Sequence, residues 1–358
     1  MKMYDPIRIG MIGSGHIAGS HAACWQNEAV ITAVCSRQRS KAEQLARKFD
    51  IPVVCDDIPS LLNHDDVDAV GITTPPHLHH PIAMQAMQAG KHVFCEKPLA
   101  LTGEEARQMV EMAEKTGVKT GVQSGMRHFK SLRHLRQIIK QGTLGQIFSF
   151  HGAWSFDWAK DPKFPLTWRF KRDEAGTGVL GDLGVYLIDT ARWLLGEINS
   201  VCGDMNICIA QRPPLVDYHH FGELRRRSQA GMLKTSPHLV DVENEDVCHL
   251  LLRFENGVSG TIRSSRLHVE HEIKIEGERA SYVWHFKPDQ LLCRKAGETD
   301  YSSVTIPDTY SEESMVTQFL NNIRQNKNEP PTFYDGMKAQ VLMDAVVQSD
   351  RDRCWVDV

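Results

Sequence analysis

The sequence predicts an α/β protein in which a doubly wound parallel sheet is followed by an α+β domain with an open, mostly antiparallel sheet. In residues 1–125, Val- and Ile-rich runs alternate with amphipathic helical patterns, as in strands joined by crossover helices. These runs lack polar alternation, so we expect helices on both faces of the sheet. Beyond residue 145 the alternation of a half-covered sheet begins. The 358 residues suit two domains, expected at 1–125 and 126–358, with the last segment able to pack back on the first.

Strands and helices follow one another regularly in the first part. Strands are expected at 7–13, 31–36, 52–55, 67–74, 92–95 and 119–124. Helices are expected from the first strand to about residue 27 and at 41–49, 79–90 and 102–117. Thr102 and Glu105 have the spacing of a capping box, which favours a helix start there.

The second part is expected to be mainly strands, with few helices. Strands are expected at 147–156, 201–210, 246–254, 258–264, 270–276 and 281–284, and helices at 186–195, 312–325 and 335–349. Asn256-Gly257 predicts a hairpin with a type I′ turn, because this pair tolerates positive φ angles. The segment 213–237, with three consecutive arginines at 225–227, is expected to be a solvated loop.

Composition excludes several classes of protein. The 41 Lys and Arg residues against 45 Asp and Glu give a net charge of −4, so nucleic-acid binding is not expected. No apolar run approaches the roughly 20 residues of a membrane span, and the N-terminus lacks the pattern of a secretory signal. The nine scattered cysteines contain no Cys-x-x-Cys pair, which favours a reduced, cytoplasmic setting over disulfides.

A glycine motif lies where the first strand turns into the first helix. Gly13 allows a tight turn, Gly15 allows a phosphate to approach the backbone, and Ala18 lets the helix pack on the strand. The backbone N–H groups near Ser14, His16 and Ile17 would then face a pyrophosphate, helped by the helix dipole. This context predicts a Rossmann domain that binds a dinucleotide, the alternative being a turn needed only for packing.

The end of the second strand bears on the choice between NAD and NADP. An NAD site usually offers a carboxylate here, but no carboxylate occurs before Glu43. Ser36 could hydrogen-bond a 2′-phosphate, Arg37 could pair with it or stack on adenine, and Lys41 could add charge. We therefore favour NADP(H), with NAD(H) possible; the alternative is a solvated basic loop at a helix start.

Two further motifs close strands that should end at the same edge of the sheet, where ligands bind in such folds. Thr74-Pro75 and His79 follow the fourth strand, and Glu96-Lys97-Pro98 follows the fifth. Lys97 should therefore face the nicotinamide end of the cleft. Its proton affinity would fall near another cation or an oxidised nicotinamide, which suits proton handling.

A third motif in the second half pairs a carboxylate with a phenol. Within residues 178–189, Asp182 and Tyr186 are four residues apart and share one face if the segment is helical. Opposite a lysine, such a pair can bind and deprotonate an alcohol.

With these three motifs the chain resembles the Gfo/Idh/MocA oxidoreductase family over essentially its whole length. The resemblance rests on the glycine motif at 13–18, on Glu96-Lys97-Pro98, and on the Gly-x-Leu-x-Asp-x-Gly-x-Tyr-x-x-Asp pattern at 178–189. It implies nicotinamide-dependent redox chemistry on sugars, cyclitols or related polyols, and dimers or tetramers packed through the C-terminal sheet. Many members have His where this chain has Tyr186. The Tyr form resembles the glucose–fructose oxidoreductase and dihydrodiol or xylose dehydrogenase branch, which favours NADP.

The expected chemistry is hydride transfer between a carbinol carbon and the nicotinamide. Tyr186 would exchange the hydroxyl proton, Lys97 would hold that oxygen and ease ionisation of the phenol, and Asp182 would orient a neighbouring hydroxyl. Gln123, Arg127, Trp168 and Arg169 are expected to line the cleft or contact the cofactor, or else to be structural hydrogen bonders. We expect no metal, because His77, His79 and His80, like His219 and His220, lack recognisable zinc spacing.

Two other functions stay open from the sequence. One is NAD-dependent glycoside cleavage by transient oxidation, which a branch resembling this family performs. The other is a cofactor-sensing regulatory protein without catalysis, although Lys97, Asp182 and Tyr186 are all present.

Overall fold

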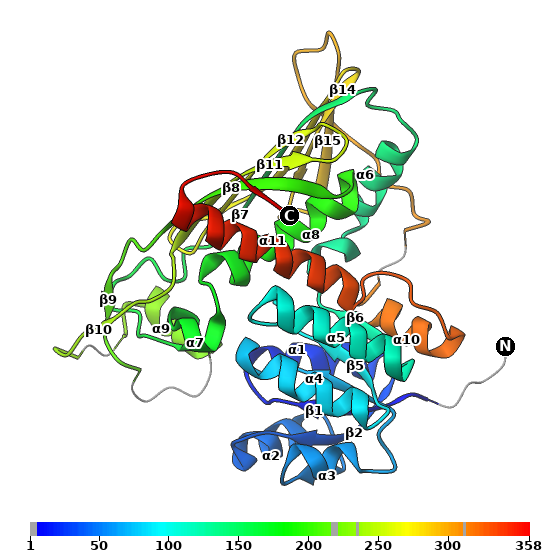
Figure 1. Cartoon of the computed structure of the whole chain (residues 1–358), viewed down its shortest axis with the longest axis vertical. Coiled ribbons are helices and arrows are strands. Elements are labelled where there is room, and N and C mark those ends of the chain that lie inside the picture. The colour runs from blue at the N-terminus through cyan, green and yellow to red at the C-terminus, as the bar shows by residue number, and fades with distance from the viewer. Residues whose placement is uncertain (1–5, 216–220, 234–235, 311–312) are drawn as a thin grey trace.

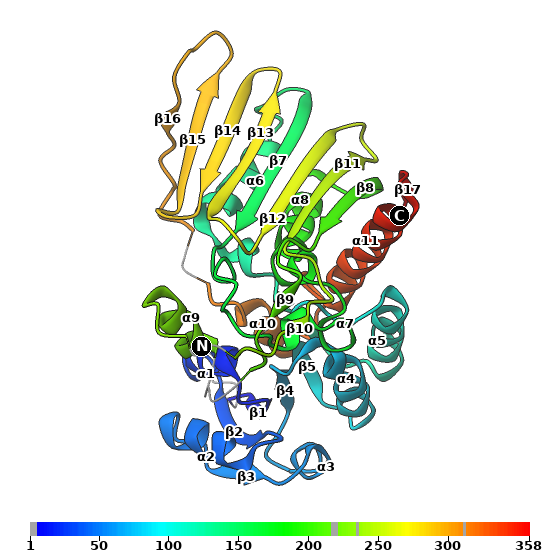
Figure 2. The same cartoon turned by 90° about the vertical axis from the view of Figure 1, so that its left-hand side faces the viewer.

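The computed structural model describes residues 6–215, 221–233, 236–310 and 313–358. Two sheets with their helices form its two parts (Figure 1). The first sheet lies at the N-terminal end of the molecule, and the larger second sheet lies above it, with the long C-terminal helix passing between the two regions (Figure 2).

The first sheet has six parallel strands in the order β3-β2-β1-β4-β5-β6. The strands are β1 (Arg8–Ile12), β2 (Val30–Cys35), β3 (Val53–Cys55), β4 (Ala69–Ile72), β5 (His92–Cys95) and β6 (Thr120–Val122). The accompanying helices are α1 (His16–Gln26), α2 (Arg39–Lys48), α3 (Ile58–Leu62), α4 (His79–Gln88) and α5 (Gly103–Thr116). The order reverses between β1 and β4, which confirms the doubly wound fold and opens a ligand crevice at that point.

Alternate side chains of β1 enter cores on opposite faces of this sheet. Ile9 and Met11 pack in the cluster that contains Trp25 of α1, whereas Ile12 packs in the cluster that contains Ile82 of α4. All of these side chains are almost fully buried, and each contributes about 1.5–3 kcal/mol through removal from water. This two-sided burial explains why the strand sequences lack polar alternation.

The second sheet has the order β16-β15-β14-β13-β7-β12-β11-β8-β17 within the described residues, and only β7 and β12 pair in parallel. Its strands are β7 (Ile147–Ser155), β8 (Ile198–Asn206), β11 (Val247–Phe254), β12 (Ser259–Ser265), β13 (Glu270–Gly277), β14 (Ala280–His285), β15 (Gln290–Lys295), β16 (Ser302–Ser303) and β17 (Val356–Asp357). On β11, Leu250 and Leu252 are buried while Leu251 and Arg253 are exposed. The predicted open, mostly antiparallel sheet is confirmed.

Helices cover one face of the second sheet and connect it to the first. The main ones are α6 (Lys130–Lys140), α8 (Val185–Leu195) and α11 (Phe333–Asp352). Shorter elements are η1 (Pro76–Leu78), η2 (Gly125–His128), η3 (Trp168–Phe170), α7 (Arg172–Ala175), the π-helical turn η4 (Leu180–Gly184), β9 (Gln211–Arg212), α9 (Phe221–Gln229), β10 (Val240–Asp241) and α10 (Thr317–Gln325).

The helix α10 packs on the first sheet although it comes late in the chain (Figure 1). The ring of Phe319 lies 5.9 Å from Trp25 and 5.6 Å from Phe94, centroid to centroid. All three rings are buried, so residues far apart in sequence build one aromatic cluster.

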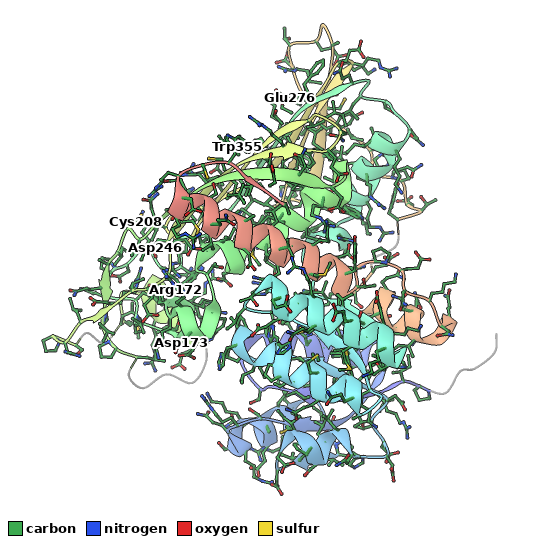
Figure 3. The ribbon with its side chains drawn as sticks, in the orientation of Figure 1. Arg172, Asp173, Cys208, Asp246, Glu276 and Trp355 are labelled. Atoms are coloured by element: carbon green, nitrogen blue, oxygen red, sulfur yellow. The ribbon has the colours of Figure 1, made fainter. Side chains whose placement is uncertain are left out.

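A buried ion pair fixes the segment that leads into β11. The carboxylate of Asp246 accepts a 2.6 Å hydrogen bond from Arg266 and further bonds from the backbone N–H groups of Cys208 and Ile209. Figure 3 labels Cys208 and Asp246 on neighbouring segments. Because Asp246 is fully buried, these partners are needed to offset the loss of its hydration.

The structure differs from the sequence prediction in one loop and in two helices. The predicted loop 213–237 contains the helix α9, because Leu224 is buried and Phe221 packs against Trp158, so the segment has an apolar face. The helix α6 was not predicted, although its apolar residues recur at helical spacing. The predicted helix start at 312 lies outside the described residues, and the described helix begins at Thr317.

The predicted hairpin forms, but the prediction of a type I′ turn is wrong. Gly257 has a φ of +84°, whereas Asn256 is not among the residues with positive φ. The N–H of Phe254 donates to the carbonyl of Val258, and the N–H of Gly257 donates to that of Phe254. This is the geometry of a three-residue connection, in which a single glycine supplies the left-handed conformation.

Candidate active site

The glycine turn after β1 has room for a ligand. Gly13 has a φ of +107°, and a Cβ atom there would lie 2.8 Å from Thr73 Oγ1, so only glycine fits. In front of Gly15, by contrast, no described atom lies within 4 Å of such a Cβ position. No side chain caps α1, which begins immediately afterwards. An open helix start behind a tight glycine turn fits the pyrophosphate of a dinucleotide.

The end of β2 is polar and positively charged. Ser14 Oγ donates to Ser36 Oγ at 2.7 Å, which joins the glycine turn to the end of this strand. Arg39 is engaged by Glu43 and Asp56. No ion pair of Arg37 or Lys41 occurs among the described residues, so both positive charges are available to an anionic ligand.

His79 joins the two loops that end β4 and β5. Its ring is fully buried, with Nδ1 2.8 Å from the carbonyl oxygen of Pro98 and Nε2 2.9 Å from that of Thr74. Burial lowers the pKa of His79, although the two carbonyl oxygens act in the opposite direction. His79 thus holds the two loops together from within the protein. The Thr74 hydroxyl, beside Pro75, is buried and has no hydrogen-bond partner among the described residues. This hydroxyl could bind a cofactor group.

Glu96 is also a support. It is 6% exposed, and its carboxylate lies 2.6 Å from His21 Nε2 and accepts from the backbone N–H of Lys97. Burial opposes the carboxylate, but His21 and Lys97 outweigh it and lower the pKa of Glu96. These two contacts of the Glu96 carboxylate fix the backbone from which Lys97 projects.

The three predicted catalytic side chains meet at one place. Lys97 Nζ donates to the backbone oxygen of Asp182 at 2.6 Å and lies 3.3 Å from its carboxylate. The same nitrogen lies 4.8 Å from the ring centroid of Tyr186. Lys97 and Asp182 retain 14% and 21% exposure, so they line a surface that a substrate can reach. The turn η4 runs directly into α8, so Asp182 and Tyr186 come from one continuous segment and both contact Lys97.

The protonation states differ in part from the expectation. Burial raises the pKa of Tyr186 to about 12, even though Lys97 acts in the opposite direction. Burial opposes the Lys97 ammonium, but Tyr186, Asp182 and Glu96 outweigh it and raise the pKa of Lys97. Asp182 is held ionised because Lys97 and Arg169 outweigh its burial and lower its pKa. In this state Lys97 is a charged donor and Tyr186 a neutral phenol, so Lys97 alone does not make the phenol acidic.

The remaining predicted residues separate into two groups. Gln123 follows β6 and is 7% exposed, and Arg169 lies 3.6 Å from Asp182 and over the ring of Trp168. These three residues adjoin the cleft. Arg127 instead forms ion pairs with Asp189 and Asp335, so it has the structural role that the sequence left open and not a contact with the cofactor.

Two residues near the site were not predicted. Glu245 is buried and accepts hydrogen bonds of 2.8 Å from the N–H groups of Gly178 and Leu180, which fixes the start of the segment carrying Asp182. Phe221 of α9 packs against Arg169, and its ring lies 6.1 Å from that of His16, so α9 lies beside the glycine turn. Neither role has a local signal, because each partner lies tens of residues away.

Comparisons with known proteins agree with this geometry. Residues 7–124 match the oxidoreductase family with an NAD-binding Rossmann fold, GFO_IDH_MocA, and residues 132–283 match the GFO/IDH/MocA C-terminal domain. Levoglucosan dehydrogenase of Pseudarthrobacter phenanthrenivorans is 30% identical, over 98% of both chains. This chain belongs to the GFO/IDH/MocA oxidoreductase family.

Other GFO/IDH/MocA relatives align along nearly the whole chain. Trans-1,2-dihydrobenzene-1,2-diol dehydrogenase of Mus musculus is 26% identical over 95% of this chain and 96% of its own. The structure of levoglucosan dehydrogenase in complex with NADH and L-sorbose superimposes with a TM-score of 0.88 at 28% identity, covering 98% of both chains. The predicted family and its oxidoreductase class are confirmed, and the first domain has the NAD-binding fold.

The described part of this GFO/IDH/MocA chain has neither a membrane-spanning helix nor a cluster of metal ligands. None of its helices combines the length and the apolar character that crossing a membrane requires. No group of three His, Cys, Asp or Glu side chains in these ranges is placed to hold a metal ion, while His219 and His220 lie outside them.

Proposed function

We propose that this protein is an NADP(H)-preferring oxidoreductase that interconverts a secondary alcohol and a ketone on a sugar, cyclitol or related polyol. The observation that carries the proposal is the convergence of Lys97, Asp182 and Tyr186 at the carboxyl edge of the first sheet. The names of relatives that act on levoglucosan and dihydrodiols support a polyhydroxylated substrate.

Each of the three side chains has a separate task in this proposal. The Lys97 ammonium donates to the reacting oxygen. The phenolate form of Tyr186 takes the hydroxyl proton during oxidation, and the neutral phenol returns it during reduction. Asp182 accepts a hydrogen bond from a neighbouring substrate hydroxyl, and Arg169 holds that carboxylate in place. A bound nicotinamide would supply the hydride acceptor or donor, held by the glycine turn, Thr74 and Gln123.

A substrate panel tests the proposal. We expect the purified protein to change the absorbance of reduced nicotinamide with at least one of levoglucosan, methyl glucosides, xylose and inositols. Lys97→Met is expected to abolish turnover while leaving cofactor affinity within twofold. Turnover that survives in this variant would overturn the catalytic assignment. Full cofactor binding without turnover of any panel member would favour a sensor, and release of the aglycone without net cofactor reduction would favour glycoside cleavage.

The preference for NADP rests on this chain's own residues, since the levoglucosan dehydrogenase structure is a complex with NADH. Replacing Arg37 by Ala should weaken NADP⁺ affinity about tenfold, because one charged hydrogen bond to the 2′-phosphate is lost, and should leave NAD⁺ affinity unchanged. Arg39→Ala is the matched control, because Arg39 is already engaged by Glu43 and Asp56. Titration by intrinsic fluorescence measures both constants, and tighter binding of NAD⁺ to the native protein would contradict the preference.

The organisation of the chain is also part of the proposal. Residues 1–125 form the dinucleotide-binding domain, 126–358 form the substrate-binding and oligomerisation domain, and α10 packs back on the first. The exposed face of the second sheet, which includes Leu251, would join two or four subunits. The nine cysteines are unpaired, which suits the cytoplasm. Light scattering after size exclusion measures the subunit number.

A further inference from the structure

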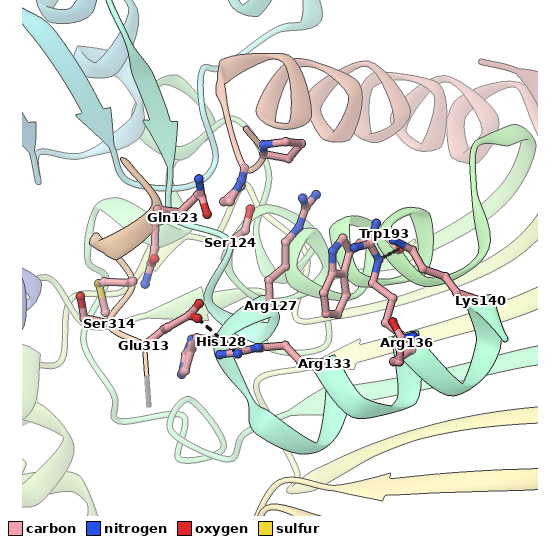
Figure 4. A pocket seen from close by; sticks show the side chains of 15 residues that line it. Gln123, Ser124, Arg127, His128, Arg133, Arg136, Lys140, Trp193, Glu313 and Ser314 are labelled. Atoms are coloured by element: carbon pink, nitrogen blue, oxygen red, sulfur yellow. Dashed lines mark hydrogen bonds and ion pairs between the residues drawn. The ribbon is translucent and has the colours of Figure 1, made fainter. Parts of the chain in front are cut away.

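A second concave site lies away from the proposed catalytic residues. A pocket of about 310 Å³ is enclosed by η2, α6, the C-terminal half of α8 and the segment before α10. Figure 4 shows side chains from these elements converging on it. None of Lys97, Asp182 and Tyr186 lines this pocket, whose volume is at the lower end of the range for small-molecule sites.

One face of α6 makes the pocket strongly basic. Arg133, Arg136 and Lys140 follow at the three- and four-residue spacing that places them on one side of the helix. Arg136 donates through Nε to the carbonyl oxygen of Trp193 at 2.9 Å, and its guanidinium lies 4.9 Å from the centroid of the Trp193 ring. These contacts fix the orientation of Arg136 without neutralising its charge.

The carboxylates in and around the pocket already have arginine partners. Glu313 pairs with Arg133 at 3.2 Å, and Asp189 and Asp335 pair with Arg127. Among the described residues, Arg136 and Lys140 have no carboxylate partner. Burial, together with the nearby charge of Arg127, lowers the pKa of Arg136. A bound anion would relieve this uncompensated positive charge.

The inner wall of the pocket adds polar groups that lack partners. Gln123 Oε1 and His128 Nδ1 are buried and form no hydrogen bond within the described residues. Both residues line the pocket, and Gln123 is 7% exposed. A buried polar atom without a partner costs about 1–3 kcal/mol. A ligand hydroxyl could satisfy His128 Nδ1, whereas Gln123 also borders the proposed cofactor cleft.

We propose that this pocket binds a small polyanion that also carries hydroxyl groups, as hydroxylated polycarboxylates and phosphorylated sugars do. Arg136 and Lys140 bind its anionic groups, and His128 binds one of its hydroxyls. Neither Gly13 nor Gly15 of the proposed phosphate-binding turn after β1 lines this pocket.

Calorimetric titration tests this proposal on the full-length protein saturated with NADP⁺, so that the cofactor site is filled. The probes are citrate and fructose 1,6-bisphosphate, with glucose as the uncharged comparison, all at one ionic strength. We expect one of the two anions to bind with a dissociation constant below about 1 mM, and glucose not to bind. The tighter anion identifies a carboxylate or a phosphate ligand. If neither anion binds up to about 10 mM, the proposal is wrong.

Charge-matched variants locate the binding. The double variant R136Q/K140Q should weaken the bound anion at least about tenfold, because two charged donors are lost. The control R47Q/K115Q also removes one arginine and one lysine, both exposed and outside the pocket, and should change affinity less than twofold. Equal weakening in both variants would show a general charge effect and refute the site. Lys140→Glu tests the same point at one exposed position, where loss of folding is not expected. Since no turnover is measured, these results do not depend on the proposed catalysis.

Discussion

At the scale of single residues, the proposed mechanism depends on one phenol in an unusual environment. Tyr186 lies against the Lys97 ammonium, and yet burial raises its pKa to about 12. A group with so high a pKa is almost entirely protonated at neutral pH. It is therefore ready to donate during reduction, but only a small fraction can accept a proton during oxidation.

This difference predicts opposite pH behaviour in the two directions. kcat/KM for alcohol oxidation should rise steadily between pH 7 and 10, because the ionised fraction of a group with a pKa of about 12 grows tenfold per pH unit. kcat/KM for ketone reduction should stay nearly flat in that range. Tyr186→Phe keeps the ring against Lys97 and should lower kcat by roughly 10²–10⁴ while removing the rise. A rise of the same slope in this variant would assign it to another group.

At the scale of elements, the position of Asp182 depends on a carboxylate from another segment. Glu245 accepts hydrogen bonds from the N–H groups of Gly178 and Leu180 and thereby fixes the approach to η4. A Cβ atom on Gly178 would lie 2.2 Å from the carbonyl oxygen of Glu245, so the two backbones touch directly. Burial raises the pKa of the Glu245 carboxyl, although the hydrogen bonds from the N–H groups of Leu180 and Gly178 act in the opposite direction.

Glu245→Gln should therefore disturb catalysis through position. An amide accepts at only one of its two ends, so one of the two N–H groups loses its acceptor and stability falls by about 1–3 kcal/mol. We expect kcat to fall at least about tenfold, while the affinity for the nicotinamide cofactor, whose proposed site is at the glycine turn, changes less than twofold. Glu243→Gln is the control, since Glu243 accepts a single backbone N–H, from Arg172, which one amide oxygen can replace. Equal effects of the two substitutions would exclude a positioning role.

The elements also show where sequence reasoning succeeds. Lys97 could be placed because strands of a parallel sheet end at a common edge, and Asp182 with Tyr186 because four residues span one helical turn. Thr102 could be recognised as the cap of α5. Its hydroxyl accepts a 3.2 Å hydrogen bond from the backbone N–H of Glu105. Glu245 and Phe221 could not be placed, because their partners are distant in the chain and only the folded arrangement brings them together.

At the scale of the whole molecule, one arginine connects three elements. Arg127 of η2 binds Asp189 of α8 and Asp335 at the start of α11, and all three side chains are at most 12% exposed. Asp335 also completes the capping box of α11 with Thr332. A buried charge network thus joins η2, α8 and α11, and the loss of any one member leaves a buried charge without its partner.

Arg127→Ala should destabilise the protein by about 3–5 kcal/mol, because two buried carboxylates are left without their cation. The comparison is Arg107→Ala, which removes an exposed pair with Glu104 and should cost less than about 1 kcal/mol. Urea unfolding followed by circular dichroism measures both free energies. A cost for Arg127→Ala no larger than that for Arg107→Ala would contradict the network's role.

The position of α10 has a consequence for synthesis on the ribosome. Phe319 completes the cluster of Trp25 and Phe94, so one face of the first sheet keeps apolar side chains uncovered while the following two hundred residues are made. An N-terminal fragment that ends near residue 125 already contains every strand of that sheet and still lacks this cover. The nascent chain therefore exposes apolar surface until α10 has been synthesised. We expect chaperones to bind this surface during that interval.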